Sequence, residues 1–137
     1  MTYHEQMLAQ FGIAMLSFIL LDTLWLGFVM NGFYKANLAP LARMSGGNLT
    51  PIWPAAALVY PLLAAGITFF VLNRARTPLE ALGYGALIGV VIYGVYDFTN
   101  YSTLRDWPVT LALVDLAWGA VICGTTAWIT ATLTRAA

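Results

Sequence analysis

The sequence predicts an all-α integral membrane protein, a four-helix bundle that crosses the bilayer. Of its 137 residues, 61% are hydrophobic and 9% are charged, whereas an ordinary soluble domain carries about 25% charged residues. So few charges cannot cover the surface of a small soluble domain, and lipid must therefore be the solvent for most of this surface. The apolar residues also gather into stretches of about 20 residues, the length that a spanning helix needs.

The apolar stretches are predicted to form four transmembrane helices within a single domain that covers residues 1–137. The first stretch is too long and too polar at its centre for a signal peptide, so we expect it to be retained. Only the first connection is long, and we expect it to include a short helix along the membrane interface. Pro78 is well placed to open the third helix. The predicted spans run over residues 11–30, 54–72, 79–100 and 109–133.

The charged residues exclude some partners and leave the orientation open. Formal net charge is zero, so the chain has no electrostatic attraction for nucleic acid. One histidine and one cysteine are too few for a zinc site built from one chain, and the sequence identifies no cofactor. Four spans place both termini on one face, and the six Lys and Arg residues divide equally between the faces. With this balance the positive-inside rule does not determine the orientation of the chain. Arg74 and Arg76, which lie in a short loop on the same face as the termini, favour cytoplasmic termini.

Three aspartates, Asp22, Asp97 and Asp115, fall inside the predicted spans. An aspartate at the centre of the bilayer costs about 2.5–3.5 kcal/mol on insertion scales. Counted along each helix, all three lie in the half of the membrane farther from the termini. The spans contain no Lys, Arg or His, so these carboxylates have no basic partner at their own depth. We therefore expect them to hold protons or a cation, as in proton relays, metal sites and acid–base catalysis.

The helix faces that carry the aspartates also carry aromatic and small residues. In the third span, four residues at spacings of four lie along one stripe, namely Gly85, Gly89, Tyr93 and Asp97, and Asn100 continues it. The two glycines are expected to let a neighbouring helix approach closely. In the first and fourth spans the pattern Asp-x-x-Trp occurs twice, which puts a carboxylate and an indole donor on one helix face.

These patterns predict a polar pocket that opens towards one face of the membrane. The candidate catalytic residues, acting as acid–base or ligand-anchoring groups, are Asp22, Asp97 and Asp115. The candidate ligand-binding residues are aromatic or amide side chains from all four spans: Trp25, Tyr60, Tyr93, Asn100 and Trp118. No metal-binding residues are predicted. Trp53, Tyr101 and Trp107 are expected to stand in the aromatic belt at the membrane surface.

Three motifs follow one another along the chain: LDTLWLG at residues 21–27, YGVYDFTN at residues 93–100 and VDLAWG at residues 114–119. In these motifs and their order the chain resembles an uncharacterised bacterial membrane protein family catalogued as domain of unknown function 2177. The resemblance implies a small multi-pass protein of the bacterial inner membrane and lends no established reaction. By architecture the chain is also similar to small multidrug-resistance transporters. Those transporters have one carboxylate within the membrane, whereas this chain has three aspartates there.

Three functions are open at this point. The favoured one is binding of a lipid-like or small amphipathic ligand in the pocket, with or without acid–base chemistry, so the sequence does not decide whether the protein is an enzyme. The second is a proton-coupled small transporter that works as a homodimer, in which Asp22 exchanges a proton for substrate. The third is a non-catalytic accessory subunit of a membrane complex, whose aspartates only hold neighbouring helices together.

Overall fold

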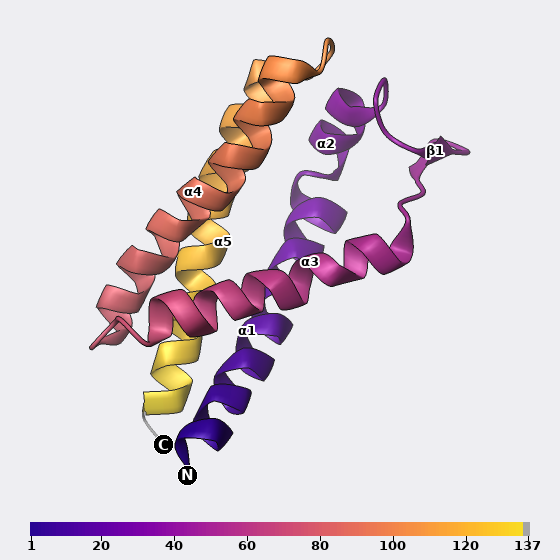
Figure 1. The fold of residues 1–137 in the computed structure, drawn as a ribbon. Helices are drawn as coiled ribbons and strands as arrows, with labels where there is room; N and C mark the ends of the chain where they lie inside the picture. The colour runs from indigo at the N-terminus through magenta and orange to yellow at the C-terminus, as the bar shows by residue number, and fades with distance from the viewer. Residues whose placement is uncertain (136–137) are drawn as a thin grey trace.

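The computed structural model describes residues 1–135 and consists almost wholly of helices. Four of these are long and apolar enough to cross a membrane. The predicted all-α membrane bundle is therefore confirmed. Two of the long helices end in a wider π-helical turn, labelled η1 and η2. The long segments are α1 (Tyr3–Leu24) with η1 (Trp25–Val29), α3 (Trp53–Gly66) with η2 (Ile67–Leu72), α4 (Pro78–Thr103) and α5 (Val109–Arg135) (Figure 1).

Local capping sets where two of the long helices begin. Thr2 and Glu5 form a capping box, in which each side chain accepts a hydrogen bond from the backbone amide of the other residue. This cap starts α1 well before the predicted first span. The Thr77 hydroxyl accepts a hydrogen bond from the amide of Glu80, and Pro78 occupies the first turn of α4 as predicted.

The long first connection contains helix α2 (Asn31–Leu38) and a hairpin of strands β1 (Met44–Ser45) and β2 (Asn48–Leu49). Gly46 and Gly47 form its turn with φ angles of 56° and 77°, a conformation that glycine adopts without steric cost. The sequence predicts a short helix in this segment but not the hairpin, because two-residue strands leave no alternating pattern. Both elements lie at the end of the bundle opposite to the termini (Figure 1).

The long helices pack unevenly around one another. α4 and α5 lie side by side, and α1 packs against α5 and α3 (Figure 1). α3 crosses the bundle obliquely, so that η2 packs against α1, α4 and α5 while the first turns of α3 diverge from α4 (Figure 1). Leu20, Leu62 and Val95 are among many large apolar side chains on the outer surface. Such a surface suits contact with lipid chains.

The apolar core fills the half of the bundle nearer to the termini. Its buried side chains come mostly from α1, α3, η2 and α5 and include Ala14, Phe18, Leu63, Ile67 and Ile122. A smaller cluster at the opposite end contains Tyr34, Trp107, Leu111 and Ala112. The space between the two clusters is where the aspartates of α1 and α5 lie.

Glycines allow α4 and α5 to approach closely. A Cβ at Gly85 would lie 2.6 Å from the carbonyl oxygen of Cys123, and a Cβ at Gly89 would clash with the carbonyl oxygen of Gly119. A Cβ at Gly119 would in turn clash with the ring of Tyr93. The predicted close approach of a neighbouring helix to Gly85 and Gly89 is therefore confirmed, and α5 is that helix. These glycines form a seam that holds the first half of α4 against α5.

Candidate functional site

Asp22 lies near the end of α1 and joins three helices through its half-buried carboxylate. Oδ2 accepts a hydrogen bond from the hydroxyl of Tyr60 on α3 at 2.9 Å. Oδ1 accepts one from the indole Nε1 of Trp118 on α5 at 3.1 Å. Both donors are uncharged, so they orient the carboxylate without neutralising it.

Asp115 of α5 is linked to η1 through the short helix α2. The hydroxyl of Tyr34 donates to Oδ1 of Asp115 at 2.7 Å, and the same hydroxyl oxygen accepts from Nε1 of Trp25 at 3.1 Å. Tyr34 is 6% exposed, and this burial raises the pKa of its hydroxyl above the ordinary value. The hydroxyl therefore keeps its proton and remains a donor to the carboxylate.

Asp97 of α4 is the least satisfied of the three carboxyl groups. It is 0% exposed, and neither of its oxygens has a hydrogen-bond partner within residues 1–135. Leaving a buried polar group unpaired costs about 1–3 kcal/mol, and more when the group is charged. The carboxyl group of Asp115 adjoins it. A proton shared between the two carboxyl groups would make one of them a donor to the other and lower this cost.

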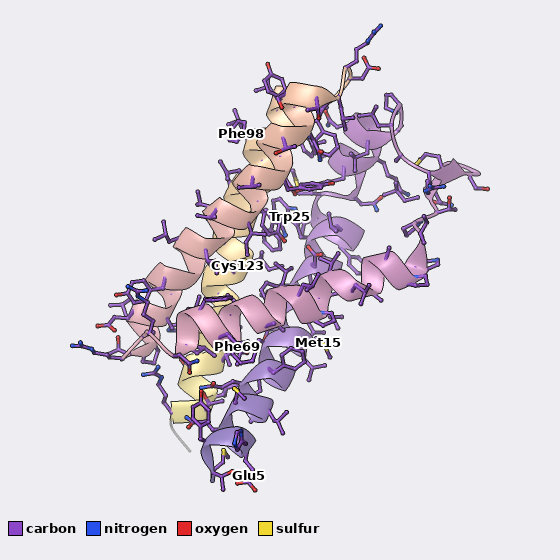
Figure 2. All side chains as sticks on the ribbon, viewed as in Figure 1. Glu5, Met15, Trp25, Phe69, Phe98 and Cys123 are labelled. Atoms are coloured by element: carbon purple, nitrogen blue, oxygen red, sulfur yellow. The ribbon has the colours of Figure 1, made fainter. Side chains whose placement is uncertain are left out.

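The two Asp-x-x-Trp motifs meet across α1 and α5. The rings of Trp25 and Trp118 are stacked, with centroids 4.4 Å apart and 5° between their planes. Each indole donates to a residue outside its own motif, Trp118 to Asp22 and Trp25 to Tyr34. Trp25 lies between α1 and the α4–α5 pair (Figure 2). The stacked indoles therefore form an aromatic wall between η1 and α5.

A cavity of about 240 Å³, here called the polar pocket, lies beside this wall. Leu38 of α2 and Leu49 of β2 line it from the first connection. Sites for drug-sized ligands measure about 300–1,000 Å³, so the polar pocket has room for a head group rather than for a whole amphiphile. Most of its other lining side chains are polar or aromatic and include Asp22, Tyr34, Tyr93, Trp107, Asp115 and Trp118.

Most of the predicted site residues meet at the polar pocket. Asp22, Tyr93, Asp115 and Trp118 line it, Trp25 and Tyr60 hydrogen-bond to residues that line it, and Asp97 adjoins Asp115. Asn100, which is half-buried, does not line it in the described part of the chain. Within residues 1–135, no group of three or more His, Cys, Asp or Glu side chains is placed to hold a metal ion. The catalytic and ligand-binding roles of these residues stay a prediction.

Trp107 and Tyr34 are among the residues of the polar pocket that the sequence did not place in the site. Trp107 is expected in the aromatic belt, but it is 9% exposed and lines the pocket, so that prediction is wrong. Its indole nitrogen is buried and has no hydrogen-bond acceptor within the described residues. Tyr34 belongs to the first connection, where no spanning periodicity indicates which way a side chain points. No pattern in the sequence indicates its contact with Asp115, which lies 81 positions away.

We expect Tyr34→Phe to loosen α2 from the bundle. The change removes the donor to Asp115 and the acceptor of Trp25, and a hydrogen bond to a charged group contributes about 1.5–3 kcal/mol. Thermal unfolding in detergent should show lower stability. Tyr101→Phe, which removes a hydroxyl from a half-exposed tyrosine of α4, is the control. Equal stability of the two variants would contradict a structural role for the Tyr34 hydroxyl.

Comparison with known proteins identifies the family. Residues 7–132 match the family described as "Predicted membrane protein (DUF2177)". The match covers most of the chain and all three sequence motifs, so the chain belongs to this family and the resemblance is confirmed. No curated protein and no solved structure gives a significant match. The family description and the four long apolar helices agree on a multi-pass membrane protein.

Proposed function

We propose that this DUF2177 membrane protein binds a small amphipathic or lipid-like ligand in the polar pocket, in the bacterial inner membrane. The proposal is carried by an unmatched polar group at the pocket. Trp107 lines the pocket, and its indole nitrogen is buried without an acceptor within residues 1–135. Buried polar groups are rarely left unpaired, and each exception needs an explanation. A ligand that supplies the missing acceptor is that explanation.

The charges around the pocket restrict the head group of the ligand. Asp22 and Asp115 both line the pocket, and no Lys, Arg or His lies in the predicted spans. An anionic head would be repelled by these carboxylates, strongly so where the dielectric constant is low. A neutral or cationic head can instead donate hydrogen bonds to them. The ligand is therefore an amphiphile whose head is not anionic.

The carboxyl pair also supports acid–base chemistry on the bound ligand. Asp97 adjoins Asp115, and two carboxyl groups that share one proton contain an acid and a base side by side. Asp115 lines the pocket and is the member that would exchange a proton with the ligand. Asp97 would then supply or store that proton behind it, and Asp22 would anchor the head group.

The transporter hypothesis needs a continuous polar path towards both faces of the membrane. The half of the bundle nearer to the termini is filled instead by apolar side chains such as Phe18, Ile67 and Ile122. Since no contact in the described residues favours transport over binding, ligand binding is the function that we put forward. The aspartate variants described in the Discussion distinguish ligand binding from the accessory-subunit hypothesis.

We expect the protein to bind 1-monododecanoylglycerol and to reject dodecanoate. The two amphiphiles carry chains of equal length, but the first has a neutral hydroxyl head and the second an anionic head. The protein would be reconstituted in nanodiscs of dimyristoylphosphatidylcholine, and the bound fraction would be measured by native mass spectrometry. Equal retention of both amphiphiles would indicate partition into lipid alone. Retention of neither would contradict the proposal.

A further inference from the structure

An apolar groove of about 340 Å³ lies between α3 and α4 beside the polar pocket. Its apolar walls are formed by Val59, Leu63 and Ile92. Three residues line both the groove and the polar pocket, namely Tyr93, Tyr96 and Asp115. The two spaces therefore adjoin, and together they offer a polar compartment beside an apolar one.

The oblique path of α3 produces this groove. η2, which continues α3 at its far end, packs against α4, whereas the first turns of α3 diverge from α4 (Figure 1). Val59 of α3 is 46% exposed and Tyr96 of α4 is 56% exposed, although both belong to long apolar helices. The groove therefore opens sideways from the bundle, toward the region that lipid chains fill in a membrane.

We infer that this groove holds the hydrocarbon chain of a hydroxyl-headed lipid whose head lies in the polar pocket, and that the lipid reaches the site sideways from the bilayer. The inference rests on the proposed function and specifies its ligand. The polar pocket alone is too small for an amphiphile of ordinary size. Because Tyr93, Tyr96 and Asp115 line both spaces, one molecule can occupy them together.

A hydroxyl head matches both kinds of polar group that line the pocket. The indole nitrogen of Trp107 offers an unpaired hydrogen-bond donor, and the carboxyl groups of Asp22 and Asp115 offer acceptors. A hydroxyl group both donates and accepts, whereas an ammonium only donates and a carboxylate only accepts. A fatty alcohol or a monoacylglycerol therefore satisfies the site better than a long-chain amine or a fatty acid.

The test separates the binding of the chain from the binding of the head. Val59→Trp places an indole in the groove, and Ile92→Trp does the same from the opposite wall. Leu62→Trp adds the same side chain to an exposed position of α3 outside the groove and is the matched control. Binding of 1-monododecanoylglycerol and of 1-monobutanoylglycerol would be measured in nanodiscs by native mass spectrometry, together with the oligomeric state.

We expect both groove variants to bind 1-monododecanoylglycerol about ten-fold more weakly or worse, because the loss of two buried methylene groups already has that effect. Their binding of 1-monobutanoylglycerol should be unchanged, and Leu62→Trp should bind both as the wild type does. Wild-type affinity of the groove variants for the long chain would overturn the groove assignment and leave the proposed function intact. A groove variant that changes the oligomeric state would show that a second copy occupies the groove and would also overturn it. A wild-type protein that binds neither glyceride would instead remove the proposed function itself.

In the wild type, 1-monododecanoylglycerol should also bind more tightly than dodecylamine, since the amine cannot accept from Trp107. Equal or tighter binding of the amine would overturn the assignment of a hydroxyl head. It would not affect the groove assignment, which the groove variants test separately. Trp107→Phe removes the donor while keeping an aromatic ring. It should remove the preference for the glyceride, and a preference that persists would show that the Trp107 nitrogen is not a contact of the head.

Discussion

The Asp22→Asn and Asp115→Asn variants are expected to remain folded and to bind 1-monododecanoylglycerol at least about ten-fold more weakly, because each loses a charged acceptor. In the first variant the amide oxygen can still accept from Trp118, and the hydroxyl of Tyr60 can rotate to accept from the amide nitrogen. In the second, the amide oxygen can still accept from Tyr34. The free energy of unfolding should therefore change by about 1 kcal/mol or less.

The control for these variants is Asp106→Asn. Asp106 is exposed and lies between α4 and α5, outside both helices, so the change removes the same charge at a distance from the polar pocket. Stability would be followed by thermal unfolding and binding by native mass spectrometry. If both pocket variants bind like the wild type, their carboxylates act only as links between helices. The accessory-subunit hypothesis would then replace ligand binding.

Gly89→Leu is expected to prevent normal assembly of the bundle. Any Cβ at this position clashes with the carbonyl oxygen of Gly119, and backbone atoms of a helix cannot move aside as a flexible side chain can. Overpacking of this kind costs about 1–3 kcal/mol and occasionally more, and leucine adds three further atoms beyond Cβ. The glycine seam holds α4 against α5, so pushing the two helices apart should lower both the yield of folded protein and its thermal stability.

Gly83→Leu is the matched control, because a Cβ at Gly83 would meet nothing within 4 Å. It adds the same side chain to the same helix on an exposed face. This variant should fold as well as the wild type, since leucine also has a better helix propensity than glycine. Equal thermal stability of the two leucine variants would contradict the close approach of α4 to α5.

The fold class was predictable because lipid leaves few options. A chain in the bilayer must pair its backbone groups internally, so long apolar stretches must be helices. The helix ends were less predictable. The capping box of Thr2 and Glu5 extends α1 beyond the apolar stretch, and the π-helical turns of η1 and η2 give no signal in the apolar pattern. Polar side chains and local backbone geometry decide these ends, and hydropathy does not report them.

The aspartates were predictable as the centre of the site for an energetic reason. An acidic residue in an apolar helix is costly, and counting along the helices puts Asp22 and Asp115 at similar depths. The structure has both of them lining one pocket. The stripe of Gly85, Gly89 and Tyr93 likewise follows from helical spacing alone, because residues four apart share one face.

Hydropathy and helical spacing are enough to place the polar groups of this protein at one depth among apolar helices. Which partners these groups meet depends on how the helices pack. Tyr34 reaches Asp115 across 81 positions of the chain, and no local pattern encodes a contact of that range. The groove likewise depends on the oblique crossing of α3, which results from the packing of η2 against three other helices. Periodicity indicates which face of a helix is buried, whereas the packing of whole helices decides which buried faces meet and where a space between them stays open.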